Sequence, residues 1–313
     1  MTIGIDSFSY QISLAAGTYD VFRALDSIAA LELSGIQLNI NGPNGRFLGG
    51  DPSDAAHLRA VRTALEERGL FAEIGGARTQ PEAVERQLRL CAEIGAGVLR
   101  TLLVFEGSLK ETLERSRRDL EQSLPLAAEL GVRIALENHE DVTATELLTC
   151  LEQINDPWLG ACLDTGNDLS LYGDPVESAR LLAPWAATTH IKDQKLVRLG
   201  ETIYSVGVPL GEGDIDLAAI LPVIRRESRL DRILIQDTTG YAAPLNRFER
   251  TDVERGVFGE EAPAYESPEA LRRDGLLLSL DGLGTSELRA YAAAKEQAIE
   301  RDVARVKSWL EQT

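Results

Sequence analysis

The sequence has few cysteines and few histidines, three of each among 313 residues. Cys91, Cys150 and Cys162 lie in separate apolar segments, and no two of them form a Cys-x-x-Cys pair. An odd number of separated cysteines is typical neither of a disulfide framework nor of a structural zinc site. We therefore expect three buried, reduced thiols.

Positive charge is also scarce. Lys and Arg number 32 against 50 Asp and Glu, which gives a net charge of −18. Nucleic acid is not an expected partner, because Lys and Arg are what neutralise its phosphates. Sugars and other small polar metabolites suit this composition better.

Long hydrophobic runs are missing. No apolar stretch approaches the roughly 18 to 20 residues that a membrane span needs. The first ten residues, MTIGIDSFSY, also lack the basic start and apolar stretch of a signal peptide. These absences predict a cytoplasmic protein with no membrane partner.

What the sequence does contain is a repeated alternation of short apolar runs with segments of helical periodicity. The predicted strands are Thr2–Ile5, Gly35–Ile40, Phe71–Ile74, Val98–Val104, Arg133–Leu136, Leu159–Leu163, Ala187–Ile191 and Arg232–Ile235. Clear helical segments are Leu109–Leu130, Thr145–Ile154, Pro175–Leu182 and Leu217–Glu227. Glycines that suit helix ends are Gly131, after Leu130, and Gly95, after Ile94 of an earlier segment.

Eight such units indicate an α/β protein of one domain, residues 1–313, folded as a (β/α)8 TIM barrel. An open doubly wound sheet usually stops at about five to seven strands. The dinucleotide-binding motif G-x-G-x-x-G does not follow the first strand, and a Walker A motif is missing.

Two stretches break the alternation. Residues Gln194–Asp214 follow the seventh strand and indicate an excursion over the barrel mouth. Residues Thr238–Leu283 form a long, charged insertion after the eighth strand, longer than a plain connection requires. We expect a lid, a partner-binding element or a partly ordered insertion there, and then a final helix over Ser286–Leu310.

In such a barrel the active site lies at the carboxyl ends of the strands. Four strand ends in the second half carry side chains that bind metals. These are Glu137 after the fifth strand, Asp164 after the sixth, His190 after the seventh and Gln236 after the eighth. Carboxylates, an imidazole and an amide oxygen together suit one divalent cation, with Mn²⁺ as our first expectation.

Each of these residues also has a plainer interpretation. Asp164 precedes Thr-Gly-Asn and suits a helix cap or Asx turn equally well. Gln236 equally suits an amide that hydrogen-bonds to the metal ligands and does not bind the metal itself. Lys192 either pairs with Asp193 or serves the substrate. Glu137 is the strongest candidate, because glutamate is rarely buried without a partner.

Other residues are expected to line the substrate pocket. Tyr10, Asn39 and Arg100 lie at or near the ends of early strands, and Arg247 lies in the insertion. His139, like His190, falls at a strand end, so two of the three histidines belong to this region.

Four stretches in chain order resemble the xylose-isomerase-like barrel family, often called sugar phosphate isomerases/epimerases. They are Leu136-Glu137-Asn138-His139, Cys162-Leu163-Asp164-Thr165-Gly166-Asn167, His190-Ile191-Lys192-Asp193 and Leu210-Gly211-Glu212-Gly213-Asp214-Ile215-Asp216. The resemblance implies one Mn²⁺, Mg²⁺, Co²⁺ or Zn²⁺ held by Glu, Asp, His and a further Glu. Gln236 stands at the last of these positions.

That glutamine changes the expected chemistry. Family epimerases use the first and last carboxylates as a pair of proton carriers, and an amide does not take a proton at neutral pH. His139 lies two residues after Glu137, so both side chains can face the barrel axis. An imidazole titrates near neutrality and suits the missing role.

Members that look like this chain, with Glu-Asn-His at the fifth strand, include lyases. They are family dehydratases, decarboxylases of 3-oxo sugar acids and the metal subunit of C-glycoside deglycosidases. We therefore expect a metal-dependent lyase acting on an oxidised sugar, sugar acid or sugar conjugate through a metal-stabilised enolate. His139 would be the general acid or base, Lys192 an auxiliary donor and Glu137 both ligand and catalytic group.

Two alternatives stay open. One is a sugar isomerase or epimerase in which water or Glu140 replaces the absent carboxylate. The other is a metal-binding subunit that needs a partner chain, which would dock on the insertion. A homo-oligomer or a small second subunit is compatible with either. The endonuclease IV branch, with three zinc ions and many histidines, does not fit three histidines and a net charge of −18.

Overall fold

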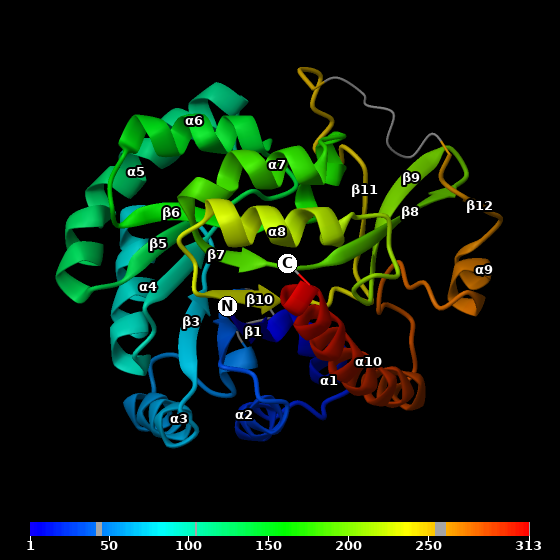
Figure 1. Ribbon diagram of the computed structural model, residues 1–313, viewed down its shortest axis with the longest axis horizontal. Coiled ribbons are helices and arrows are strands. Elements are labelled where there is room, and N and C mark those ends of the chain that lie inside the picture. The colour runs from blue at the N-terminus through cyan, green and yellow to red at the C-terminus, as the bar shows by residue number, and fades with distance from the viewer. Residues whose placement is uncertain (42–45, 104, 254–260, 313) are drawn as a thin grey trace.

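The computed structural model describes residues 1–41, 46–103, 105–253 and 261–312, and its centre is a parallel sheet of eight strands (Figure 1). The strands are β1 Thr2–Asp6, β2 Gly35–Asn39, β3 Phe71–Gly75, β4 Val98–Thr101, β5 Arg133–Glu137, β6 Leu159–Asp164, β7 Ala186–His190 and β10 Arg232–Ile235. Their order in the sheet is β10-β1-β2-β3-β4-β5-β6-β7.

The two outer strands of this sheet, β7 and β10, meet and bring the barrel close to closure. The backbone amide of Ile191 donates to the carbonyl of Leu234 at 2.7 Å, and that of Gln236 donates to Ile191 at 2.8 Å. The predicted (β/α)8 barrel is therefore confirmed. The fourth strand ends at Thr101, earlier than predicted, and Val104 lies outside the described residues.

Helices surround the barrel. They are α1 Gln11–Ala15, α2 Val21–Ala30, α3 Ala55–Glu67, α4 Pro81–Ile94, α5 Leu109–Leu130, α6 Ala144–Ile154, α7 Pro175–Leu182, α8 Leu217–Glu227 and α10 Thr285–Gln312, with 3-10 turns η1 Ser7–Tyr10, η3 Asn167–Leu171 and η4 Ala183–Trp185. Helix α5 begins with a capping box between Ser108 and Glu111. Helices α4 and α5 end at Gly95 and Gly131 in the left-handed conformation, as the sequence predicts.

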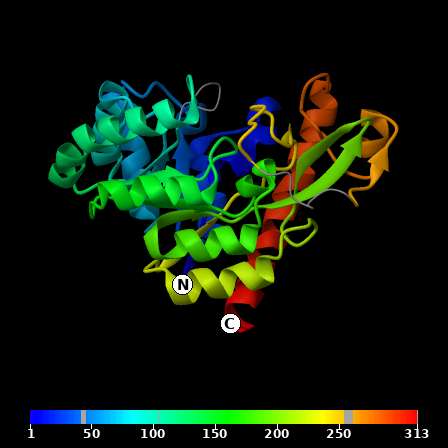
Figure 2. The same cartoon turned by 90° about the horizontal axis from the view of Figure 1, so that it is seen from above.

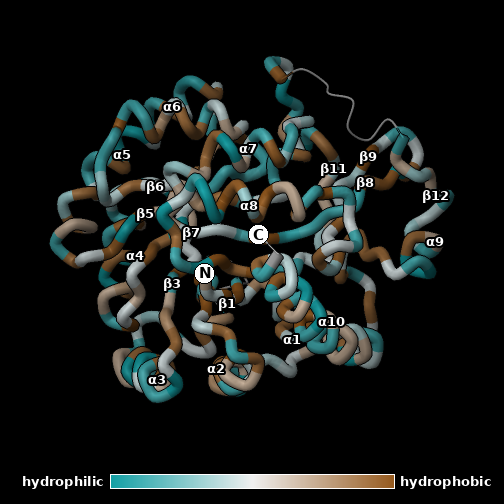
Figure 3. The backbone as a smooth tube through the Cα atoms, in the orientation of Figure 1, coloured by the Kyte–Doolittle hydropathy of each residue, from teal (hydrophilic) through white to brown (hydrophobic). Residues whose placement is uncertain are grey.

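The main hydrophobic core lies between the strands and the helices. Leu25, Val61 and Leu88, on α2, α3 and α4, are fully buried against it. In Figure 3 each surrounding helix alternates between brown and teal, as amphipathic helices do. The three cysteines are buried and unpaired, in agreement with the prediction.

Inside the barrel, polar side chains lie above a small apolar cluster. Val98, Ala135 and Cys162 belong to a separate buried cluster on β4, β5 and β6. Residues two positions further along these strands face the same way. Arg100, Glu137 and Asp164 occupy those positions, so charged groups lie directly above the apolar cluster.

A second, four-stranded sheet stands beside the barrel (Figure 1), in the order β11-β9-β8-β12. The hairpin of β8 Asp193–Leu199 and β9 Thr202–Val208 makes up most of the predicted excursion after the seventh strand. The insertion supplies β11 Ala242–Pro244, β12 Ala264–Tyr265 and helix α9 Pro268–Arg273. Residues 254–260 of the insertion lie outside the described part.

Asp193 holds the chain after the hairpin. Its carboxylate accepts hydrogen bonds from the backbone amides of Gly211, Gly213 and Ile215, at 2.8 to 3.3 Å. Asp193 therefore does not pair with Lys192. A Cβ on Gly213 would lie 2.2 Å from the Asp193 carboxylate, so glycine is required there.

Helix α10 packs against α1 and α8 (Figure 2). The ammonium group of Lys295 donates to the backbone carbonyl of Asp237 at 2.9 Å, and Asp302 accepts from the amide of Leu210 at 3.1 Å. Both acidic residues and the lysine are buried. Within the described residues, no helix is both long and apolar enough to cross a lipid bilayer.

Candidate active site

Side chains from four strands converge on one nitrogen of His190, at the end of β7. The Nδ1 atom of His190 lies 3.4 Å from Oε1 of Glu137 and 3.5 Å from Oδ2 of Asp164. The side-chain amide of Gln236 lies 3.3 Å from the same nitrogen. The structure therefore brings together all four residues that the sequence proposed as metal ligands, and each is buried.

Asp164 uses its two oxygens differently. Its Oδ1 accepts from the backbone amides of Gly166 at 2.8 Å and Asn167 at 3.0 Å, which is the Asx turn considered above. Its Oδ2 is buried and has no hydrogen-bond partner. This oxygen instead faces two nitrogen-bearing groups, Nδ1 of His190 at 3.5 Å and the ammonium of Lys192 at 3.2 Å.

The four side chains fit a divalent cation. Donors around an ion at about 2.1 Å stand roughly 3.0 to 3.5 Å apart. The separations at His190 agree with that spacing, and Asp164 Oδ2 is left for a further partner. An amide has nearly the same shape when its oxygen and nitrogen exchange places, so a half-turn would present the Gln236 oxygen. Glu137, Asp164, His190 and Gln236 would then hold the ion.

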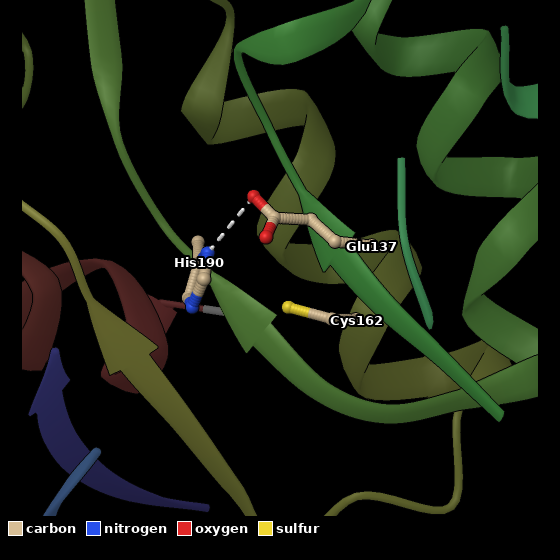
Figure 4. Close-up of side chains that lie close together, drawn as sticks. All are labelled: Glu137, Cys162 and His190. Atoms are coloured by element: carbon tan, nitrogen blue, oxygen red, sulfur yellow. Dashed lines mark ion pairs between the residues drawn. The ribbon is translucent and has the colours of Figure 1, made fainter. Parts of the chain in front are cut away.

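Cys162 is a neighbour that the sequence did not predict at this position. Its sulfur, Glu137 and His190 have ligand-type atoms within 4.8 Å of one another (Figure 4). Burial raises the pKa of the Cys162 thiol to about 12. Since only the thiolate binds metals well, Cys162 is a poorer ligand than Asp164. The sequence did contain a signal for this neighbour. Side chains two residues apart on a strand face the same way, so Cys162 lies on the same face of β6 as Asp164.

Glu137 is ionised by its surroundings. Burial alone would raise the pKa of Glu137, but Arg100 and His190 outweigh it and hold the pKa well below the usual range. The Arg100 Nε atom lies 3.4 Å from Glu137 Oε2, and Asn167 donates to Glu137 Oε1 at 3.1 Å. A permanently ionised carboxylate suits a metal ligand better than a proton carrier.

His190 is surrounded by negative charge. Burial would lower its pKa, but the neighbouring Cys162, Glu137 and Asp164 raise it well above the ordinary value. This part of the barrel therefore stabilises positive charge at the end of β7.

A pocket of about 210 Å³ opens above these residues. That is smaller than the roughly 300 to 1,000 Å³ of sites for drug-sized ligands, which favours a small metabolite. Its lining consists of Phe8, Asn39, Asn41, Ala77, Arg100, Leu102, Glu137, His139, Glu140, Asn167, Lys192, Gln236, Thr238 and Tyr241.

The predicted substrate residues divide between this pocket and other places. Asn39 and Arg100 line it, and Arg100 donates to the side-chain oxygen of Asn39. Tyr10 lies elsewhere, because the 3-10 turn η1 directs Phe8 to the pocket and packs Tyr10 against Tyr19, with ring centres 6.0 Å apart. Arg247 contacts the pocket indirectly, because its Nε atom lies 2.8 Å from Oε2 of the pocket residue Glu140.

His139 lies in the pocket with about a quarter of its side chain exposed. Its Nδ1 is 3.6 Å from Oδ1 of Asp141. Burial acts to lower the pKa of His139, but Asp141, Glu137 and Glu140 together raise it above its usual value. The raised pKa favours the protonated ring, and His139 lines the pocket.

The insertion adds residues to the rim that sequence reasoning did not find. The Tyr241 hydroxyl lies 2.9 Å from one oxygen of Glu140 and 3.0 Å from the other, and Arg247 pairs with the same carboxylate. Tyr241 and Glu140 are 101 residues apart. No local sequence pattern predicts such a contact.

The comparisons with known proteins agree with this architecture. The profile of the xylose isomerase-like TIM barrel family matches residues 25–273. The chain belongs to this family. Among curated relatives, 3-oxo-isoapionate decarboxylase of Pectobacterium atrosepticum is 29% identical over 178 residues, which cover 56% of this chain and 64% of that relative.

Two solved structures show the same fold. A D-psicose 3-epimerase in the presence of D-fructose has a TM-score of 0.66 at 13% identity, covering 99% of each chain. The IOLI protein with a bound zinc atom has a TM-score of 0.61 at 15% identity, covering 76% of this chain and 89% of that one.

Proposed function

We propose that this member of the family is a divalent-metal-dependent lyase that acts on a small oxidised sugar or sugar acid carrying a 3-oxo group. One observation carries the proposal. An amide, Gln236, occupies the fourth ligand position, while a histidine, His139, lies in the pocket beside Glu137. The similarity to 3-oxo-isoapionate decarboxylase supports the same choice.

The site residues have different roles in the proposed reaction. Glu137, Asp164, His190 and Gln236 would hold a divalent ion, which would act as a Lewis acid on a substrate carbonyl. In a decarboxylation, the bond between the carboxylate carbon and the carbon beside the ketone breaks, CO₂ leaves, and the electron pair passes into an enolate. His139 then delivers a proton to that carbon, and the ketone forms again. Lys192, 3.2 Å from Asp164, contributes positive charge on the same side.

The experiment that tests this proposal is incubation of the purified protein with Mn²⁺ and a panel of 3-oxo sugar acids. We expect CO₂ release, or elimination from the same substrates, and loss of that activity after chelation. Metal analysis of the wild type and of Glu137→Ala, Asp164→Ala and His190→Ala provides the matched comparison. Clean interconversion of ketose epimers without fragmentation would reject the lyase.

A second candidate is an isomerase or epimerase with the same metal site. The likeness to the D-psicose 3-epimerase structure over 99% of each chain favours it. Glu140 is the replacement considered above for the missing carboxylate, but Tyr241 and Arg247 already engage it. In deuterated water an epimerase would label one carbon of the recovered sugar, and Gln236→Glu would raise that activity.

A further inference from the structure

A buried glutamine, Gln37 at the third position of β2, contacts the far side of His190. Its side-chain oxygen Oε1 lies 3.0 Å from Nε2 of His190, and its side-chain nitrogen donates to Oε2 of Glu73 at 3.1 Å. All three side chains are completely buried. We infer that Gln37, oriented by Glu73 and Arg100, is a positioning residue that fixes which nitrogen of His190 is offered to a metal.

The chemistry of its neighbours fixes the orientation of the Gln37 amide. A carboxylate only accepts hydrogen bonds and a guanidinium only donates them. Glu73 therefore requires the amide nitrogen on its side. Arg100, whose Nε donates to Gln37 Oε1 at 3.3 Å, requires the amide oxygen on the other side. Both constraints select the same orientation.

His190 is determined in turn. Since the group facing its Nε2 is an acceptor, Nε2 must carry a hydrogen. The lone pair of the neutral ring is then on Nδ1, which faces Glu137 and Asp164. Asp6 is the other acceptor near Nε2, but its oxygen is 3.7 Å away, beyond hydrogen-bond length.

The chain of contacts continues to the opposite end of the barrel. Glu73 accepts from the Thr188 hydroxyl at 2.7 Å, and its other oxygen pairs with Arg232 at 3.1 Å. The Arg232 guanidinium lies over the Phe71 ring, 4.4 Å from its centre, and is partly exposed. Burial raises the pKa of Glu73, and the Arg232 charge acts in the opposite direction, toward the carboxylate form that accepts from Gln37.

The inference rests on the proposed metal site, and metal affinity is its first test. Isothermal titration with Zn²⁺ or Mn²⁺ should show a loss of about 10- to 100-fold for Gln37→Met, the usual effect of removing such a supporting contact. Glu73→Gln should bind more weakly, because an amide at position 73 no longer fixes the orientation of Gln37, whereas Gln37→Glu still places an acceptor opposite Nε2. In the double variant the carboxylate stands at position 37 and the amide at position 73. An acceptor then still faces His190 Nε2, so the affinity for metal should recover. Asp302→Asn, the same chemical change outside the barrel, should bind as the wild type does.

A second measurement does not need the metal. In ¹⁵N-labelled, metal-free protein, two-bond nitrogen–hydrogen couplings identify the hydrogen on Nε2 of His190. The hydrogen bond to Gln37 Oε1 protects this hydrogen from exchange in both the neutral and the protonated ring. We expect a slowly exchanging, hydrogen-bonded signal in the wild type and a shifted, faster-exchanging one in Gln37→Met. His57→Gln and His139→Gln variants assign it.

The outcomes separate the two proposals. Unchanged metal affinity in Gln37→Met, or a double variant that binds no better than Glu73→Gln, would overturn the positioning role. A wild type that binds no metal but shows the protected Nε2–H would reject the proposed function and leave the hydrogen-bond assignment standing. An unprotected Nε2–H in the wild type would overturn the assignment itself.

Discussion

His139 and His190 lie near the same pocket, yet their surroundings predict different roles. His190 is completely buried among acidic groups, whereas His139 is about a quarter exposed toward the pocket. We expect His139→Asn to lower kcat by about 10² to 10⁴ with metal content unchanged, the usual loss when a general acid is removed. His190→Asn should lose the metal. Steady-state kinetics with metal analysis on both variants checks this, and metal loss in His139→Asn would contradict it.

The divided role of Asp164 leads to a prediction that separates stability from metal binding. Asp164→Asn keeps an oxygen for the two backbone amides of the turn but removes the charge that faces His190. Asp164→Ala removes both. We expect both variants to bind metal poorly and to lose the ion pair with Lys192, and the alanine variant to lose about 1 to 3 kcal/mol more stability than the asparagine variant. Urea unfolding in EDTA measures the difference, and equal stabilities would refute the turn's contribution.

The sequence predicted which side chains would lie together at the rim, because parallel strands end at one rim and their side chains alternate. Glu137, Asp164 and His190 follow from those two rules. Gln37 and Glu73 do not, because a polar residue within a strand gives no indication of which distant side chain it contacts. Tyr10 illustrates another limit, since one short 3-10 turn decides whether it or Phe8 reaches the pocket.

At the scale of elements, one arginine anchors the insertion to the barrel. Arg250 is 3% exposed and pairs with Glu146 of α6 through two hydrogen bonds, at 2.6 and 2.8 Å. We expect Arg250→Met to destabilise this segment by about 1 to 3 kcal/mol, because Glu146 is left partly buried without its partner.

Limited proteolysis provides the measurement. Cleavage within the insertion should be faster in Arg250→Met, while the main unfolding transition of the barrel shifts less. Arg62→Met is the matched control, since Arg62 pairs with Glu66 at an exposed helix position, where such pairs are worth about 0.5 kcal/mol or less. Equal cleavage rates in the two variants would rule out the anchoring role.

Sequence periodicity predicted the barrel elements well, with Leu109–Leu130, Pro175–Leu182 and Leu217–Glu227 matching the observed helices. The second sheet was not predicted. β11 and β12 are three and two residues long, and each pairs with a strand from the excursion after β7. Local periodicity does not report pairing between distant segments, so these strands had no recognisable pattern.

For the molecule as a whole, Asp302 makes stability depend on pH. Burial and the charge of Asp237 raise the pKa of Asp302 from 3.8 to about 8. The folded state therefore holds this proton more tightly than the unfolded state. The resulting stabilisation is complete below about pH 4, declines as the pH rises, and is lost above about pH 8.

Asp302→Asn should remove this dependence, because an asparagine oxygen still accepts from Leu210 and carries no charge. Relative to the variant, the wild type should lose stability steadily between pH 5 and pH 8, at up to about 1.4 kcal/mol per pH unit. Urea unfolding of both proteins at several pH values gives the comparison. A stability difference that stays constant with pH would contradict the assignment.

The four-stranded sheet has a consequence for engineering and for evolution. Two of its strands come from the segment after β7 and two from the segment after β10, and β11 and β12 each pair only across that divide. Without the first segment, β11 and β12 lose the strands they pair with, and without the second segment the β8–β9 hairpin loses its neighbours on both edges. Chimaeras that exchange substrate loops between relatives should therefore transplant both segments together, and descent with altered specificity is expected to have changed them in concert.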